Sequence, residues 1–151
     1  MSERFDVVIV GGGIAGGALA TVLARAGKRA LVLEKTTEYR DRVRGEWIAP
    51  WGVAELKTLG LYDTFIAAGG HHVTKHVPYG DAVDPATAEA AALDLTGLLP
   101  GIPGPLTIGH PKMCELLRET SVAAGATVLR GVSDIVRLTF GASPSVTYVR
   151  D

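Results

Sequence analysis

The sequence predicts an α/β fold with a parallel central sheet, and three features near its start support this. Residues 7–10 are all β-branched, which suits a strand that is buried on both faces of such a sheet. After a glycine-rich turn, residues 14–26 repeat small and apolar side chains at helical spacing. Residues 29–34 form a second apolar strand that ends on an acid. Together these segments predict one β-α-β unit over residues 5–34.

The turn between the first strand and the helix has the glycine spacing of a dinucleotide-binding fingerprint, at Gly11, Gly13 and Gly16. Gly11 permits a tight turn, Gly13 lets a diphosphate approach the backbone, and Gly16 lets the helix lie close to the strand. The helix begins at Ile14 and Ala15, where free N–H groups and the positive end of the helix dipole favour phosphate oxygens. These five residues are therefore predicted to bind the cofactor.

Glu34 ends the second strand, where the fingerprint places an acid that accepts hydrogen bonds from ribose hydroxyls. A carboxylate there repels a 2′-phosphate, so the predicted nucleotide is FAD or NAD rather than NADP. The alternative interpretation of the same residues is a glycine-rich turn beside a solvated glutamate.

Composition excludes several classes of function. The chain has 151 residues, about one domain, with a net charge of −1 and no basic patch for nucleic acid. Its single cysteine, Cys114, excludes a disulfide or a cysteine metal site within the chain, and we expect it in the core. His71, His72 and His76 lack a suitably spaced carboxylate, so no metal site is predicted. No signal peptide and no apolar run of membrane-spanning length is visible, which predicts a cytoplasmic protein.

The rest of the chain is predicted as an excursion of helices and strands over 46–108 and a returning helix with strands over 110–150. The expected helices are 50–59, 61–68 and 111–124, and the expected strands are 72–79, 92–95, 126–130, 134–140 and 145–150. We expect surface loops at the prolines between them, at 85, 100, 103 and 105. The chain stops at Asp151 within a predicted strand, so we expect a partial, apparently truncated domain with an additional β-rich portion.

Three segments, in order, resemble the N-terminal part of a flavoprotein monooxygenase of the aromatic-hydroxylase type, whose fold is a glutathione-reductase-like FAD domain. The segments are Gly11–Gly16 with Glu34; Arg42–Glu46 with Ile48, Pro50, Gly52 and Leu59–Leu61; and Gly109–Pro111 with Leu116–Leu117, Ala123–Ala126 and Val132.

The resemblance implies FAD as the cofactor and adds further site residues. It implies that Arg44, or alternatively Arg42, contacts the FAD, since a guanidinium offers a planar fork of donors to phosphate. His110 stands where relatives commonly place arginine or glutamine near the diphosphate. Glu46 and Trp47 would approach the flavin ring. Val132 matches a position beside the adenine, and we expect it to be a core residue.

The resemblance also implies an activity, in which NAD(P)H reduces the flavin and an oxygen atom from O₂ is transferred to an organic substrate. The family's later Gly-Asp and Asp-Gly segments are not found in this sequence, and no side chain is assigned a catalytic role. Three alternatives stay open: a flavin-dependent halogenase or prenyl-chain reductase of the same fold, a nucleotide-binding module without turnover, and a fragment that does not fold stably because strands without partners leave exposed edges. The sequence indicates no oligomeric state.

Overall fold

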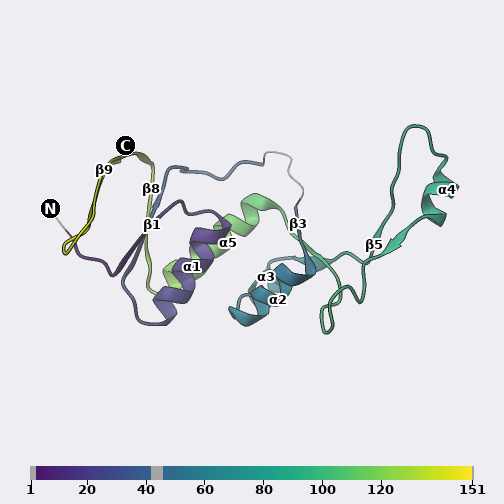
Figure 1. Ribbon diagram of the computed structural model, residues 1–151, viewed down its shortest axis with the longest axis horizontal. Coiled ribbons are helices and arrows are strands. Elements are labelled where there is room, and N and C mark those ends of the chain that lie inside the picture. The colour runs from purple at the N-terminus through teal and green to yellow at the C-terminus, as the bar shows by residue number, and fades with distance from the viewer. Residues whose placement is uncertain (1–2, 42–45, 151) are drawn as a thin grey trace. The chain divides into compact units, whose positions relative to one another are not determined.

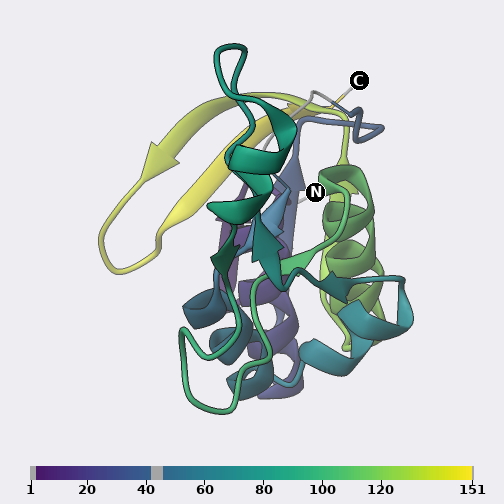
Figure 2. The same cartoon turned by 90° about the vertical axis from the view of Figure 1, so that its right-hand side faces the viewer.

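The computed structural model describes residues 3–41 and 46–150, and its contacts divide the chain into two units. One unit comprises residues 1–42 and 110–151, and the other comprises residues 43–109. Figures 1 and 2 show the elements of both units, and each unit is described by itself.

The first unit contains a parallel sheet in the order β1-β2-β8, with two helices and a hairpin. Its elements are β1 (Val7–Val10), α1 (Ile14–Arg25), β2 (Ala30–Glu34), α5 (His110–Ala123), β8 (Thr127–Arg130), β9 (Val132–Thr139) and β10 (Ser145–Arg150). The α/β fold with a parallel sheet is confirmed. All five residues of β2 are buried, as expected for the central strand of a sheet that is covered on both faces.

Alternation along the strands assigns their side chains to two layers. Ala30 and Val32 of β2 face one core cluster with Ala20 and Ala24 of α1. Leu31 and Leu33 face the other cluster, which includes residues of the β9–β10 hairpin. The side-chain period of two thus places helices on one face of the sheet and the hairpin on the other.

Helices α1 and α5 lie side by side in both views (Figures 1 and 2). They pack closely at Gly17, where an added β-carbon would lie 2.8 Å from the β-carbon of Leu117. Helix α1 ends as predicted before Gly27, whose φ of +73° lies in the left-handed region that favours glycine. Cys114 and Val132 are both buried, as expected from the sequence.

The second unit consists of short elements. They are β3 (Trp47–Ile48), α2 (Pro50–Thr58), α3 (Tyr62–Ala67), β4 (His71–His72), β5 (Lys75–His76), α4 (Pro85–Ala90), β6 (Leu93–Asp94) and β7 (Leu106–Thr107). The strands form two antiparallel sheets, one in the order β3-β7-β4 and one that pairs β5 with β6. Val53, Leu61, Phe65 and Leu106 are fully buried in this unit.

Two expectations for the second unit are corrected. The single strand predicted over 72–79 is two strands of two residues each, and Pro78 has no N–H to continue a ladder. Pro85 begins helix α4 instead of lying in a loop, and the carboxylate of Asp84 caps that helix by accepting from the N–H of Thr87 at 3.1 Å. The strands β3 and β7 were not predicted.

Candidate functional site

The glycine turn joins the carboxyl end of β1 to the start of α1. Gly11 has a φ of +100°, and its N–H donates to the carbonyl of Leu33 at 2.8 Å. Gly13 stands immediately before the helix, and no side chain caps α1. A β-carbon on Gly13 would meet nothing within 4 Å. The first N–H groups of α1, including those of Ile14 and Ala15, have no partner within the helix. Both of these residues are exposed.

Gly16 keeps the start of the helix against the turn. A β-carbon at this position would lie 1.9 Å from the carbonyl oxygen of Gly11 and 3.3 Å from Cγ2 of Ile9. No side chain larger than hydrogen fits there without a shift of the backbone. The geometry of the chain therefore requires glycine at Gly11, by its positive φ, and at Gly16, by its close approach to Gly11, whereas Gly13 leaves open space before the helix.

Glu34 lies against the glycine turn at the end of β2, with only 7% of its surface exposed. Its Oε2 accepts a hydrogen bond from the N–H of Gly12 at 2.5 Å, and its Oε1 accepts from the N–H of Thr36 at 2.6 Å. Each carboxylate oxygen of Glu34 still has acceptor capacity, because each oxygen has two lone pairs and accepts one of these bonds. The acid is thus fixed beside the helix start, as a ribose-binding carboxylate requires.

Tyr39 is a member of the site that the sequence analysis missed. Its hydroxyl donates to the carbonyl of Gly12 at 2.7 Å, across 27 positions of sequence. Burial, assisted by the negative charge of Glu34, raises the pKa of Tyr39 to about 12, so the hydroxyl stays protonated at neutral pH. Its only sequence signal is an aromatic residue in an otherwise polar loop, which does not reveal a partner so far away.

A charged cluster supports the ring of Tyr39. The guanidinium carbon of Arg130 lies 5.1 Å from the ring centre, within the range of a cation–π contact. Nε of Arg130 donates to the carbonyl of Thr36 at 3.3 Å, and Nη1 donates to Oε2 of Glu115 at 3.3 Å. Hydrogen bonding from Arg118 lowers the pKa of Glu115, which keeps this carboxylate ionised. The cluster therefore links helix α5, the end of β8 and the loop after β2.

The remaining predicted residues fall in different places. His110 is the first residue of α5, and its Nε2 lies 3.6 Å from the buried sulfur of Cys114. Arg44 and the alternative Arg42 lie outside the described residues. Glu46 belongs to the second unit, where its backbone carbonyl accepts from the hydroxyl of Thr107 at 2.8 Å.

One histidine of the second unit, His72, has structural partners on both ring nitrogens. Nδ1 of His72 lies 2.8 Å from the carbonyl oxygen of Gly104, and its Nε2 lies 2.9 Å from the hydroxyl of Tyr62. Among residues 3–41 and 46–150, no three His, Cys, Asp or Glu side chains are grouped so that they could hold a metal ion. Within the same residues, no helix has both the length and the apolar character to cross a membrane.

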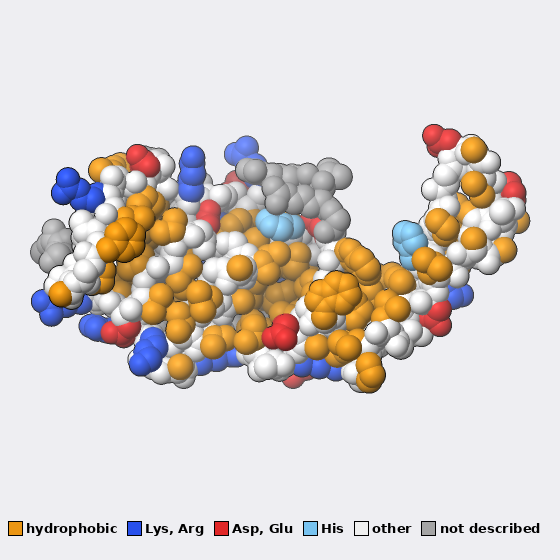
Figure 3. All heavy atoms as spheres, viewed as in Figure 1, with side chains coloured by type: hydrophobic (Ala, Val, Ile, Leu, Met, Phe, Trp, Pro, Cys, Tyr) orange, Lys and Arg blue, Asp and Glu red, His pale blue; other side chains and the backbone are white. Residues whose placement is uncertain are grey.

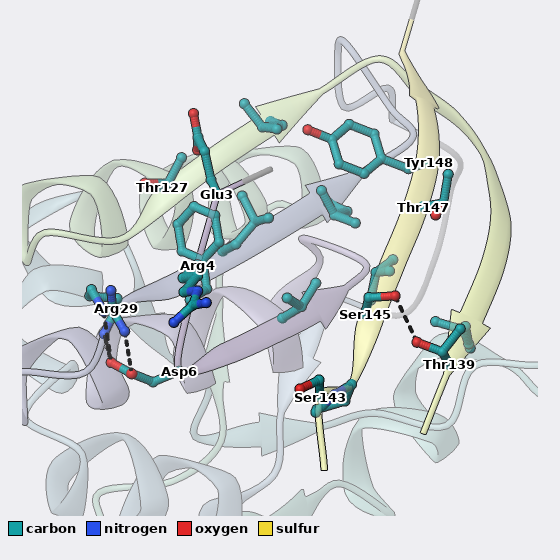
Figure 4. Close-up of a pocket in the computed structure, with 18 of the residues that line it drawn as sticks. Glu3, Arg4, Asp6, Arg29, Thr127, Thr139, Ser143, Ser145, Thr147 and Tyr148 are labelled. Atoms are coloured by element: carbon teal, nitrogen blue, oxygen red, sulfur yellow. Dashed lines mark hydrogen bonds and ion pairs between the residues drawn. The ribbon is translucent and has the colours of Figure 1, made fainter. Parts of the chain in front are cut away.

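A hollow of about 1290 Å³ lies away from the glycine turn, between the sheet and the β9–β10 hairpin (Figure 4). Leu31, Leu33 and Tyr148 line it, and the ion pair between Asp6 and Arg29 stands at its rim near the amino ends of β1 and β2. Ligands of open α/β sheets bind outside the carboxyl ends of the strands. The hollow is therefore separate from the candidate site.

Apolar side chains also reach the surface (Figure 3). Trp51 is 72% exposed and Phe140 is 87% exposed. Side chains of both charges are also visible on the face drawn in Figure 3.

A parallel β-α-β unit with an open glycine turn and an acid at the end of its second strand defines a dinucleotide-binding domain. The family comparison specifies which kind. The chain matches the FAD binding domain family over residues 4–139, and it belongs to that family.

Individual relatives agree with this assignment. Squalene monooxygenase of Rattus norvegicus is 42% identical over 72 residues, which are 48% of this chain and 13% of that protein. OxyS anhydrotetracycline hydroxylase from Streptomyces rimosus is 28% identical with a TM-score of 0.73, covering 97% of this chain and 28% of that chain. The myxobacterial FAD-dependent halogenase CndH is 24% identical with a TM-score of 0.75, covering 99% of this chain and 34% of that chain. The chain thus spans about a third or less of the length of each of these relatives.

Proposed function

We propose that this chain is the FAD-binding part of an NAD(P)H-dependent flavoprotein monooxygenase that transfers oxygen from O₂ to an organic substrate. The observation that carries the proposal is the glycine turn, which has an open position at Gly13 and the buried acid Glu34 beside it. These residues fit the diphosphate and ribose of a dinucleotide, and the match to the FAD binding domain family supports FAD. A β-carbon on Gly13 would fill the space that the diphosphate needs.

Each residue has a defined part in holding the cofactor. The N–H groups at the start of α1, at Gly13, Ile14 and Ala15, donate to phosphate oxygens. Glu34 accepts from ribose hydroxyls with the lone pairs that its two backbone bonds leave available. Gly16 keeps the helix start close to β1.

Two further contacts are proposed on the resemblance of the sequence. Arg44 offers a guanidinium to the FAD, and the imidazole of His110, at the start of α5, donates to the diphosphate. The flavin, when bound, supplies the redox chemistry of the reaction. The role of this chain's residues is to bind and orient it.

Oxygen transfer is proposed in preference to halogenation. The 42% identical relative is a monooxygenase, whereas the halogenase CndH is 24% identical and shows only the fold. The organic substrate and O₂ follow from this choice.

Titration of the purified chain with FAD and, separately, with NAD tests the proposal. We expect FAD to bind, to lose fluorescence on binding and to stay with the protein through gel filtration. Binding of NAD without binding of FAD would instead favour a nucleotide-binding module. For the product of the full coding sequence, we expect O₂ and NAD(P)H to be consumed in equal amounts with substrate, and flavin reduction without O₂ uptake would contradict oxygen transfer.

A further inference from the structure

The glycine turn contains three consecutive glycines, and side chains from elsewhere in the chain hold two of its peptide groups. Glycine loses more conformational freedom on folding than any other residue, so such a turn needs outside contacts to keep one conformation. Glu34 holds the N–H of Gly12, and the hydroxyl of Tyr39 holds the carbonyl of the same residue.

The bond from Tyr39 fixes more than one atom. The carbonyl of Gly12 and the N–H of Gly13 belong to the same peptide group, which is planar and trans, so they point in opposite directions. A hydroxyl that holds this carbonyl therefore also determines the direction of the N–H of Gly13. That N–H stands at the open start of α1, where no side chain caps the helix.

We propose that Tyr39 is a positioning residue of the nucleotide site, whose hydroxyl orients the Gly12–Gly13 peptide so that its N–H serves the cofactor's diphosphate. The proposal rests on the proposed binding of FAD and assigns a role to a residue outside the glycine fingerprint. Tyr39 touches the turn and acts on the ligand only through it.

The surroundings of Tyr39 match this role. Arg130 covers one face of its ring at 5.1 Å, and Arg130 is itself held by Thr36 and Glu115. A β-carbon on Gly12 would lie 3.3 Å from the hydroxyl of Tyr39, so the phenol and the turn are in close contact. The phenol is thus held before any nucleotide arrives, and such preorganisation favours binding.

The test compares ligands with and without phosphate on the variant Tyr39→Phe. Dissociation constants are measured for FAD by fluorescence quenching, and for ADP and adenosine by NMR shifts. The matched control is Tyr79→Phe, which removes a phenol that donates to Oε1 of Glu89 on an exposed surface of the second unit. We expect Tyr39→Phe to weaken FAD and ADP about three- to tenfold, because one oriented hydrogen bond is lost, and to leave adenosine within about twofold. Tyr79→Phe is expected to change none of the three.

Unchanged affinity for FAD and ADP in Tyr39→Phe would overturn the proposal, and so would an equal loss for adenosine, which a merely structural role predicts. If circular dichroism shows that Tyr39→Phe does not fold, Arg130→Gln replaces it. This variant removes the guanidinium from the ring of Tyr39 and keeps the hydroxyl. We expect it to lose less affinity for ADP than Tyr39→Phe does, and to leave the affinity for adenosine nearly unchanged. An equal loss of affinity for ADP and adenosine counts against the proposal. Wild-type chain that binds neither FAD nor ADP would contradict the proposed function itself, and this inference with it.

Discussion

Adding one methyl group at Gly16 or at Gly13 is expected to have different consequences. In Gly16→Ala the new β-carbon, which is bonded directly to the backbone, would lie 1.9 Å from the backbone carbonyl oxygen of Gly11. The two groups must separate by about 1 Å, and overpacking of this kind costs about 1–3 kcal/mol. The start of α1 has to move away from β1, so both the free energy of unfolding and the affinity for FAD should fall.

Gly13→Ala should affect binding alone. The φ of Gly13 is −71°, which alanine adopts without strain, and the new β-carbon meets no atom within 4 Å. Alanine is a poorer residue before a helix than glycine, but it also restricts the unfolded chain, so we expect stability to change by less than about 1 kcal/mol. The methyl group occupies the space proposed for the diphosphate, and we expect affinity for FAD to fall at least about tenfold, which is about 1.4 kcal/mol.

Thermal unfolding followed by circular dichroism, together with FAD titration, separates the two effects. Gly16→Ala should lower Tm by about 3–9 °C for a chain of this size and weaken FAD binding, whereas Gly13→Ala should weaken FAD binding at nearly unchanged Tm. Gly80→Ala is the matched control, because a β-carbon there also meets nothing within 4 Å and the residue lies in the other unit. A Gly13→Ala chain that binds FAD as tightly as the wild type would show that the diphosphate does not approach this glycine. A Gly16→Ala chain of wild-type Tm would show that the close approach to Gly11 does not constrain the fold.

Three further changes test other parts of the first unit. Glu34→Gln replaces one of the two acceptor oxygens by a donor that faces a backbone N–H. We therefore expect the free energy of unfolding in urea to fall by about 1–3 kcal/mol and FAD binding to weaken. Wild-type stability of this variant would contradict the two backbone bonds. Gly17→Ala places a β-carbon 2.8 Å from that of Leu117, so it should destabilise the chain by about 1–3 kcal/mol in the same assay. A variant as stable as the wild type would argue against the close packing of α1 on α5. Hydrogen bonding from Arg29 lowers the pKa of Asp6 to about 2 from its usual 3.8. Because the pKa is lower in the folded chain than in the unfolded chain, ionised Asp6 stabilises the fold above about pH 4, and this contribution is lost as the pH falls towards 2. The urea midpoint of Asp6→Asn should therefore fall less over this range than that of the wild type, and parallel curves would exclude the contribution.

The first unit was predictable because its elements follow regular patterns. β-Branched residues, helical spacing and a terminating glycine specify β1, α1 and β2 locally, and the fingerprint places Gly11, Gly16 and Glu34 together without knowledge of the fold. The second unit was harder to predict because strands such as β3 and β7 have two residues each, too few for an alternation to be recognised. Their pairing depends on contacts between residues about sixty positions apart.

Helix α4 shows how one residue type supports two predictions. Proline lacks an N–H, so it suits either a loop or the first turn of a helix, where that N–H has no partner in any case. The capping side chain of Asp84 before Pro85 and the alanines after it decide for the helix. A prediction from prolines alone could not make that distinction, because the deciding signal lay in their neighbours.

The residues that hold the glycine turn in place, Tyr39 and Arg130, are determined by the edge of the sheet and its loops rather than by a local sequence pattern. Parallel strands bring their carboxyl ends to the same edge, and Glu34, the last residue of β2, is paired in register with Arg130, the last residue of β8. Once β8 is placed beside β2, a charge at the end of β8 must lie near the acid and the loop that follows it. Arg130 could therefore have been nominated from topology, whereas the bond of Tyr39 to Gly12 depends on the path of that loop and required the structure.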